Sequence, residues 1–394
     1  MIKIARKEDC TGCHGCYNVC PKKCIDMNFD EEGFLYPSVD SDKCVECGLC
    51  EKVCPIIHTV EVENEPIAIG CYNKDEKIRM ESSSGGIFTL ISEIVIKSGG
   101  VVFGAEFDEN YNVRHNYVDN MQDLQKFRGS KYVQSTIGNS YYDAKKFLEQ
   151  GRQVLFSGTP CQIAGLKRYL QKNYDNLICQ DIVCHGVPST YVWDHYKKFI
   201  ANGRKISSVK FRDKSTGWKT YSLQIDFDDG FSYKDIGNEN SYIKGFVRDF
   251  YLRPSCYECK YKTLHRESDI TLADFWGIEA NEPELDDNKG TSLIFVNSDK
   301  GREYFEKIKK NIIFKIVDIH RAVTFNPSAH KSCTYTRKRG IFYKKYKINN
   351  FDLLIKKLMK ENSLKKIITF SNSVKGKIKR MICERKKGDY PEEI

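Results

Sequence analysis

Short apolar runs alternate with amphipathic stretches through the middle of the chain. The apolar runs predict strands at 67–72, 101–107, 153–157 and 177–184. The amphipathic stretches predict helices at 87–97, 140–150, 162–171 and 191–201. This alternation favours an α/β layer in which at least some strands pair in parallel.

The pattern changes on both sides of this central region. After Ser207, three segments at 209–212, 220–227 and 231–235 predict antiparallel strands, the last two forming a hairpin through Asp228-Asp229-Gly230. A further strand is expected at 270–276 and a further helix at 301–311. Residues 29–39 predict a small hairpin, and the acidic segment Val60–Pro66 predicts a linker. Residues 351–370 place apolar positions at helical spacing opposite lysine pairs, which predicts an amphipathic helix.

Two copies of one cysteine pattern, C-x2-C-x2-C-x3-C-P, lie between residues 10 and 55. The first copy is Cys10, Cys13, Cys16 and Cys20, and the second is Cys44, Cys47, Cys50 and Cys54. This run binds [4Fe–4S] clusters in two-cluster bacterial ferredoxins, where the fourth cysteine ligates the other cluster. We therefore expect Cys54 to complete the cluster of the first copy and Cys20 that of the second. Zinc sites use paired C-x2-C units, so zinc and a disulfide scaffold are the weaker alternatives.

Two polar loops are candidates for binding an anionic ligand. Ser83, Ser84, Gly85 and Gly86 precede a predicted helix, whose free N–H groups suit a phosphate. The second loop combines cations with hydroxyl groups in Arg128, Ser130, Lys131 and Tyr132. A plain helix cap and a solvated basic loop are the alternatives. The dinucleotide fingerprint G-x-G-x-x-G is absent.

A third loop, with Ser157, Gly158, Thr159, Cys161 and Gln162, follows a predicted parallel strand, where open α/β sheets place ligands. Cys161 opens a helix, which lowers a thiol pKa, and is a candidate nucleophile, cluster ligand or packed thiol. Three further cysteines are candidates for the same site as Cys161: Cys184, Cys256 and Cys259. Four thiols at separated strand ends can converge on one more cluster, with zinc binding and apolar packing as alternatives. Cys24, Cys71, Cys179, Cys333 and Cys383 fit no pattern and are expected to be packing or surface thiols.

The net charge of +10 is concentrated in the last part of the chain, because residues 334–394 hold 18 Lys/Arg against 6 Asp/Glu. Packing of the amphipathic helix on the body, with solvated lysines, is the simpler expectation. The alternative is reversible docking on an anionic membrane surface or an acidic partner. The basic residues are not interspersed with aromatic residues, and the sequence has no recognisable nucleic-acid-binding module. We therefore expect no nucleic-acid binding. Residues 1–9 lack an apolar signal region, and the abundant thiols favour a reducing cytoplasm, with the inner membrane surface as the place for such docking.

At these motifs the chain resembles the beta subunit of coenzyme F420-reducing hydrogenase and dehydrogenase, fused to an N-terminal two-cluster ferredoxin. The motifs that carry the resemblance are SSGG (83–86), RGSKY (128–132), SGTPCQ (157–162), CHGVPS (184–189), C-x2-C (256–259) and DITLADFWG (269–277). The resemblance implies FAD lined by the first three of these motifs. It also implies a third [4Fe–4S] cluster held by Cys161, Cys184, Cys256 and Cys259.

The expected fold class is α+β, with three regions. Residues 1–60 form a bacterial ferredoxin-like domain, residues 66–335 an α/β flavin-binding domain with a mixed sheet, and residues 336–394 a basic, partly helical tail. The implied function is an iron–sulfur flavoprotein oxidoreductase. It exchanges electrons between F420-like deazaflavin, or another reduced carrier, at FAD and a one-electron redox partner protein through the clusters. The alternative is a non-catalytic relay subunit that docks on a larger redox complex.

Overall fold

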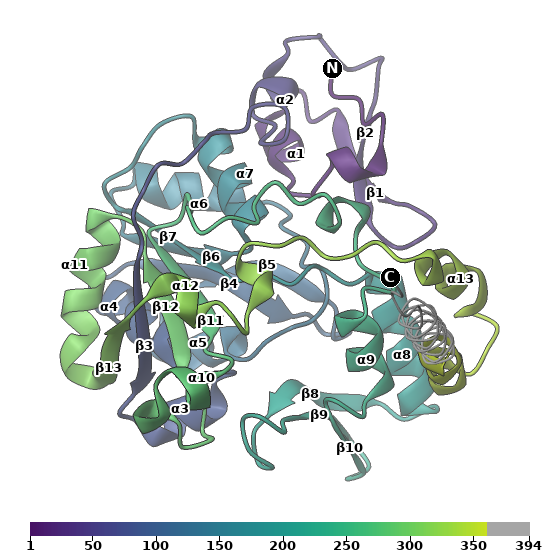
Figure 1. Cartoon of the computed structure of the whole chain (residues 1–394). Coiled ribbons are helices and arrows are strands. Elements are labelled where there is room, and N and C mark those ends of the chain that lie inside the picture. Colours follow the sequence, from purple (N-terminus) through teal and green to yellow (C-terminus); the bar gives the residue numbers. More distant parts are fainter. Residues whose placement is uncertain (361–394) are drawn as a thin grey trace, which may run out of the picture. The chain divides into compact units, whose positions relative to one another are not determined.

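An eight-stranded mixed sheet forms the centre of the molecule (Figure 1). The computed structural model describes residues 1–360 of the chain. The strands follow the order β13-β3-β12-β11-β7-β6-β4-β5. They are β3 (Ile67–Asn73), β4 (Val101–Phe107), β5 (Val113–Val118), β6 (Val154–Gly158), β7 (Leu177–Ile182), β11 (Ile270–Asp274), β12 (Ser292–Val296) and β13 (Ile312–Val317).

The four inner strands β4, β6, β7 and β11 run parallel, whereas the strands outside them pair antiparallel. This confirms the predicted α/β region with partial parallel pairing. Because the inner strands are parallel, their carboxyl ends meet at one edge of the sheet. The segments that follow those ends contain Cys161, Cys184 and the residues after Asp274.

Helices cover both faces of the sheet. On one face lie α4 (Ile87–Lys97) and α11 (Asp299–Ile308), and on the other α6 (Ser140–Glu149) and α7 (Pro160–Leu170). The alternation along β6 shows the division, since Leu155 packs with the first pair and its neighbours Val154 and Phe156 with the second. The inner strands are therefore buried on both sides, which explains their nearly continuous apolar sequences.

The starts of α4 and α7 have local causes in the sequence. Gly86 precedes α4 with a φ of 80°, a conformation that glycine adopts without strain, and no side chain caps the first turn. In α7, Thr159 and Gln162 form a reciprocal capping box and Pro160 occupies the first turn. Both helices thus begin beside the carboxyl edge of the sheet.

The antiparallel segments after Ser207 form a separate three-stranded sheet of β8 (Ile206–Asp213), β9 (Ser222–Phe227) and β10 (Ser232–Ile236). The predicted hairpin of β9 and β10 is confirmed. Helices α8 (Thr190–Ala201) and α9 (Ser241–Val247) pack with this sheet through aromatic side chains: Trp193 lies 4.8 Å from Phe211 and 5.1 Å from Tyr242 between ring centres.

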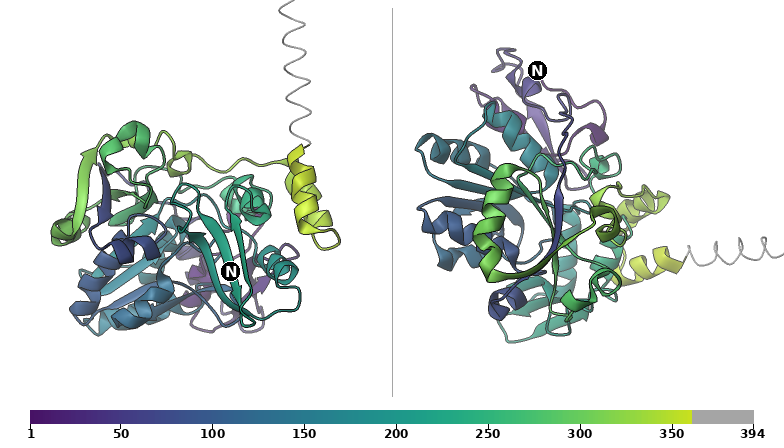
Figure 2. Two further views of the ribbon diagram at one scale, coloured as in Figure 1. Left: turned by 90° about the horizontal axis from the view of Figure 1, so that it is seen from below. Right: turned by 60° about the vertical axis from the view of Figure 1, so that its left-hand side comes forward.

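The N-terminal module contains α1 (Gly15–Val19), the hairpin of β1 (Ile25–Phe29) and β2 (Leu35–Val39), and α2 (Leu49–Lys52). The hairpin is confirmed, although its first strand begins at Ile25, earlier than expected. In Figures 1 and 2 this purple module lies against α7. The packing is tight, since a Cβ added to Gly165 of α7 would lie 2.9 Å from Cβ of Cys13. The module and the central sheet belong to one compact unit, Met1–Thr336.

Short helices connect these elements: α3 (Glu76–Glu81), α5 (Met121–Leu124), α10 (Ile278–Asn281) and α12 (Ile319–Ala322). A second unit begins at Arg337 with α13 (Arg337–Lys345). Residues 351–360 are helical, with Leu354, Ile355 and Leu358 buried and the lysines between them exposed. This confirms the amphipathic pattern for these ten residues, and the predicted continuation to 370 lies outside the described residues.

Candidate redox centre

Two cavities in the N-terminal module each collect four of its motif cysteines. The first cavity is lined by Cys10, Cys13, Cys16 and Cys54. The second is lined by Cys20, Cys44, Cys47 and Cys50. Each set joins three cysteines of one run to the last cysteine of the other run, as the ferredoxin pattern predicts.

Backbone and side-chain donors reach the cysteine sulfurs of this module. The N–H of Ile2 donates to Sγ of Cys50 at 3.3 Å, and the Arg253 guanidinium lies 3.5 Å from Sγ of Cys10. Donors of this kind stabilise the negative charge of cluster-bound thiolates. Cys24 also lines the second cavity, with its sulfur 3.3 Å from that of Cys20.

A third cavity brings together the four cysteines of the α/β region. Cys161, Cys184, Cys256 and Cys259 all line it, although they come from three distant segments of the chain. Cys161 lies in the first turn of α7, Cys184 follows β7, and Cys256 ends a short 3-10 turn. The structure thus assembles the four thiols that the resemblance implies for a third cluster.

The other residues of this third cavity suit a group of negative charge. Three cations line it, namely Arg253, Lys262 and Arg266, and no carboxylate among the described residues does. The N–H of Val187 donates to Sγ of Cys256 at 3.4 Å. A [4Fe–4S] cluster with four thiolates carries net negative charge, so this donor set fits such a group.

Burial shifts the pKa of Cys161 in the direction opposite to the one that its helix position predicts. Its position in the first turn of a helix lowers a thiol pKa in an exposed site. In the structure, however, burial raises the pKa of Cys161 above its ordinary value, and the nearby thiols of Cys259 and Cys184 act in the same direction. The raised pKa makes the free thiol a weaker nucleophile than an exposed one, whereas metal binding would still deprotonate it.

A cleft of about 680 Å³ lies at the carboxyl edge of the sheet and adjoins the third cavity. It is lined by the predicted Ser83, Ser84, Gly86, Arg128, Ser130, Lys131, Tyr132, Ser157, Gly158, Thr159 and Gln162. Thr159, Gln162, Cys184, His185, Gly186 and Val187 line both spaces. A volume of this size is usual for a site that binds a cofactor.

The two polar loops at the cleft are joined to each other. The N–H and hydroxyl groups of Ser130 both donate to Oγ of Ser83, at 2.6 and 2.8 Å. Behind the first loop, buried Lys214 donates to the backbone carbonyls of Arg79, Ser84 and Lys289. Gly85 fits against the backbone of Cys71 and Ser292, where a Cβ would come within 2.6 Å of the Cys71 carbonyl oxygen. These contacts hold the loop rigidly at the start of α4.

The predicted cations of the second loop differ in their surroundings. Arg128 is already paired with Glu81, because its Nη1 lies 2.6 Å from the carboxylate. Lys131 has only backbone carbonyls of its own loop as acceptors, at 3.2 and 3.3 Å, and burial lowers its pKa to about 7. Lys131 is therefore the cation of this loop whose charge still lacks a carboxylate partner among the described residues.

A chain of hydrogen bonds holds the third loop. The N–H of Thr159 donates to Gln162, whose Nε2 donates to Oγ of Ser135. Oγ of Ser135 lies 2.9 Å from Nδ1 of His115, and His115 Nε2 lies 3.0 Å from the carbonyl oxygen of Ser157. Since a carbonyl can only accept, Nε2 carries the proton and Nδ1 accepts from Ser135.

Several cleft residues carried no recognisable motif. His115 and Ser135 belong to the chain just described, and Arg212 and Tyr221 also line the cleft. Arg212 is paired with Asp274 at 2.7 Å, but its Nε and Nη2 have no hydrogen-bond partner among the described residues. Such orphaned buried donors are expected where a polar ligand belongs. Only the three-dimensional pairing of distant strands brings these residues together.

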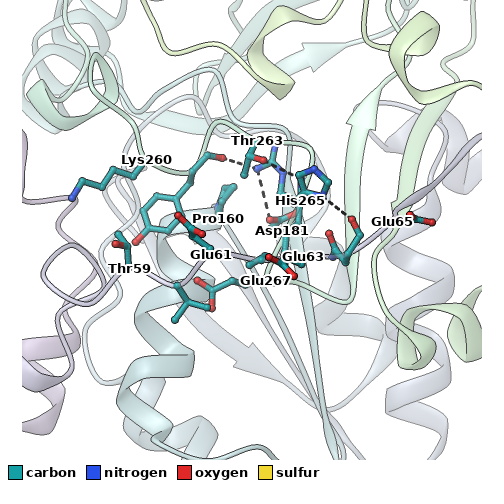
Figure 3. A pocket seen from close by; sticks show the side chains of 15 residues that line it. Thr59, Glu61, Glu63, Glu65, Pro160, Asp181, Lys260, Thr263, His265 and Glu267 are labelled. Atoms are coloured by element: carbon teal, nitrogen blue, oxygen red, sulfur yellow. Dashed lines mark hydrogen bonds and ion pairs between the residues drawn. The ribbon is translucent and has the colours of Figure 1, made fainter.

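A further cavity, of about 800 Å³, lies between the linker and residues 260–267 (Figure 3). Glu61, Glu63 and Glu65 line it together with buried Asp181, and His265 contacts the carbonyl oxygen of Asn64 at 2.6 Å. None of the predicted cysteines lines this space. The linker is thus fixed to the α/β region by contacts of its own.

Comparisons with known proteins agree with this arrangement. Residues 151–322 match the family described as the C terminus of the coenzyme F420 hydrogenase/dehydrogenase beta subunit, and residues 9–56 match the 4Fe-4S dicluster domain. The chain is 22% identical to the F subunit of F(420)H(2) dehydrogenase from Methanosarcina mazei, over 78% of this chain and 85% of that protein.

Two further similarities are more limited. The chain is 26% identical to coenzyme F420-dependent sulfite reductase of Methanocaldococcus jannaschii, over 75% of this chain but only 45% of that protein. A chain in a structure of the F420-reducing [NiFe] hydrogenase complex from Methanosarcina barkeri aligns with a TM-score of 0.46 at 14% identity, over 76% of this chain and 92% of that one. The family matches and the cysteine geometry lead to one assignment. Residues 151–322 carry the C-terminal domain of the coenzyme F420 hydrogenase/dehydrogenase beta subunit family, and residues 9–56 form an N-terminal dicluster domain for two [4Fe–4S] clusters.

Proposed function

We propose that this protein exchanges electron pairs with an F420-like deazaflavin, or another reduced two-electron carrier, at FAD in the cleft. Single electrons then pass between the cleft and a redox partner through three [4Fe–4S] clusters. The proposal rests on one observation: the cleft, the inner cysteine cavity and the first ferredoxin cavity adjoin one another. The cleft shares six lining residues with the inner cysteine cavity, and that cavity shares Thr11 with the first cavity of the ferredoxin module.

FAD would suit such a site because a flavin links two-electron and one-electron chemistry. The uncapped first turn of α4 offers N–H groups to its pyrophosphate, and Lys131 adds a positive charge. The hydrogen-bonded loops at Ser83 and Ser130 fix the direction of these donors. Cleft and inner cavity adjoin, so little protein separates the two cofactor sites.

The one-electron end of the chain is most accessible at the second ferredoxin cavity. Cys47 is the exposed member of the eight ferredoxin cysteines. Val45 beside it is 57% exposed, which leaves an apolar spot next to the cavity. We infer that a redox partner protein docks over residues 45–48.

A second candidate function is that of a relay subunit without a substrate of its own. It is favoured by the similar protein of Methanosarcina mazei, which is named as a subunit of a dehydrogenase. In that case electrons would enter and leave through bound partners. Bound flavin that a soluble donor reduces in the isolated protein would distinguish the enzyme from the relay.

The test is anaerobic purification followed by analysis of iron, acid-labile sulfide and extracted flavin. We expect about 12 iron atoms and one FAD per chain, and reduction by one of NADH, NADPH, reduced F420 or reduced ferredoxin. Replacing Cys256 and Cys259 with serine should remove about 4 iron atoms and leave the ferredoxin signals. Replacing buried Cys71 with serine is a matched control, because Cys71 lines none of the three cysteine cavities.

Two results would contradict the proposal. Folded protein with intact clusters that neither contains nor binds flavin would favour the relay function. Stoichiometric zinc in place of the last 4 iron atoms would make the inner site structural.

A further inference from the structure

One buried arginine joins the α/β region to the first ferredoxin cavity. Arg253 has a relative exposure of 0%. Its Nε donates to the backbone carbonyl of Cys10 at 2.7 Å, and its Nη2 donates to the carbonyl of Leu35 at 2.9 Å. The same Nη2 lies 3.5 Å from Sγ of Cys10, within hydrogen-bonding range for sulfur. Arg253 also lines the inner cysteine cavity.

The charge of this side chain has no carboxylate partner among the residues that the structure describes. The remaining hydrogen bond of the guanidinium runs from Nη1 to the amide oxygen of Gln134 at 3.1 Å. No ion pair between described residues includes Arg253, whereas buried Arg79 and Arg212 are each paired with an aspartate. Because an unpaired buried charge is very unfavourable, a counter-charge is expected within the site.

The surroundings keep the guanidinium beside Cys10. It lies over the Tyr36 ring, 4.3 Å from the ring centre, in a cation–π contact. Gly12 leaves room on the other side, since a Cβ added there would lie 2.8 Å from Nη1 of Arg253. The cysteine loop is thus shaped to admit this one cation.

We propose that the thiolate-ligated cluster of Cys10, Cys13, Cys16 and Cys54 is the counter-ion of Arg253, and that Arg253 raises the reduction potential of this cluster. The inference rests on the ligand set assigned under the proposed function. Reduction adds one negative charge to the cluster, so a fixed cation and a donor to sulfur stabilise the reduced form more than the oxidised form. Arg253 is a positioning and tuning residue and takes no part in bond making.

The second ferredoxin cavity lacks an equivalent group among the described residues. Its cationic groups are Lys22, which is exposed to solvent and therefore screened, and the Met1 amino group, which lies 3.7 Å from a carboxylate oxygen of Glu51. The effect of Arg253 should accordingly fall on one of the two ferredoxin clusters. This difference gives a readout that general damage to the fold would not reproduce.

The experiment is a redox titration of the anaerobic, full-length protein, monitored by electron paramagnetic resonance, with iron content measured on the same samples. In Arg253→Gln we expect one ferredoxin potential to fall and the other to stay. A tenfold loss of preference for the reduced form corresponds to a fall of about 59 mV for one electron. Arg253→Lys, which keeps the charge but loses the fork of donors, should give a smaller fall of the same potential. Arg204→Gln, at an exposed arginine paired with Asp229, is the control.

The outcomes separate this inference from the proposed function. Wild-type iron content with both ferredoxin potentials unchanged in Arg253→Gln would overturn the role of Arg253 and leave the cluster assignment intact. An equal shift of both potentials would overturn it as well. If Arg253→Gln loses iron, the comparison is made on Arg253→Lys, where unchanged potentials would overturn the inference. Wild-type protein without ferredoxin-type signals would instead contradict the proposed function itself.

Discussion

At the scale of single residues, burial determines the protonation of the side chains around the cleft. It lowers the pKa of Lys131 to about 7 and that of His115 to about 4. Both values follow mainly from removing a charged group from water, and each residue still has hydrogen-bond partners in the protein. Each of these two side chains should therefore give the protein a measurable dependence on pH.

Lys131 should make flavin binding depend on pH. In the free protein its charge is lost as pH rises through about 7, so affinity for the anionic flavin should weaken between about pH 6 and pH 8. Replacing Lys131 with methionine removes a charged hydrogen bond and should weaken binding roughly tenfold or more while flattening this dependence. Fluorescence titration of flavin-free protein measures both effects, with exposed Lys126→Met as the control. An unchanged dissociation constant in Lys131→Met would remove Lys131 from the flavin site.

His115 should make stability depend on pH in a lower range. The unfolded chain takes up a proton at His115 near its ordinary value of 6.5, whereas the folded protein does so only near pH 4. The unfolding free energy should therefore fall as pH falls below that ordinary value, by about 1 kcal/mol over the first pH unit. Anaerobic thermal unfolding at about pH 6.5 and 5.5 measures this loss, which His115→Gln should reduce. Identical losses in the two proteins would disprove the contribution.

At the scale of elements, patterns within one segment were sufficient for much of the fold. Helix α4 and strand β4 have the bounds that their apolar spacing predicts, and the hairpin of β9 and β10 forms as its Asp-Asp-Gly turn indicates. Strands β5, β12 and β13 were not predicted. Strand β5 pairs with its neighbour β4, whereas β12 and β13 both pair with the distant β3, through tertiary contacts that no local pattern contains.

The same limit applies to the site. The eight ferredoxin cysteines follow from spacing alone. For the four inner cysteines the sequence left a cluster, zinc binding and apolar packing open, and the family resemblance favoured the cluster. Arg212, His115 and Arg253 carry no sequence signal, because their roles depend on which strand or loop they face. A buried cation without a carboxylate becomes visible only once burial and partners are known.

Because α7 packs closely against the ferredoxin module, a larger residue at Gly165 should disturb the first cluster. Cys161 and Gly165 lie four residues apart and therefore share one face of α7. Replacing Gly165 with valine would insert a side chain where even Cβ lies 3.1 Å from Sγ of Cys13. We expect loss of the first cluster, seen as about 4 fewer iron atoms per chain, since overpacking of this kind costs roughly 1–3 kcal/mol.

The control is Gly340→Val in α13, where no atom lies within 4 Å of an added Cβ. It should retain all iron. Full iron content and unchanged cluster signals in Gly165→Val would show that the helix and the module can separate without loss of the cluster.

At the scale of the whole molecule, the basic second unit leads to a prediction about docking. Among the described residues, no helix is long and apolar enough to cross a membrane. The helix at 351–360 buries most of its apolar side chains, with Leu353 exposed, and also exposes Lys356 and Lys357. Docking by these residues should therefore be mainly electrostatic, with Leu353 as the exposed apolar side chain. A location in the cytoplasm, with reversible contact at the inner membrane surface or with an acidic partner, remains our proposal.

Co-sedimentation with anionic vesicles tests this role. We expect the full chain to bind at low salt and to be released at high salt. Lys356→Glu with Lys357→Glu should weaken binding by at least roughly 2 kcal/mol, or about 30-fold, since each basic residue near the surface contributes about 1 kcal/mol. The matched control reverses the charge of another exposed pair, in Lys309→Glu with Lys310→Glu. Absence of binding at low salt would leave the second unit with a structural role.

The fit of Arg253 into the space beside Gly12 has a consequence for protein engineering. A ferredoxin module grafted from another protein would supply its own clusters but leave this cation facing an unmatched loop. Any side chain at the position of Gly12 in the grafted loop would collide with the guanidinium, because even a Cβ there would lie 2.8 Å from Nη1 of Arg253. The ferredoxin module therefore cannot simply be exchanged for another one. A working chimera would have to transfer the cysteine loop and its arginine together.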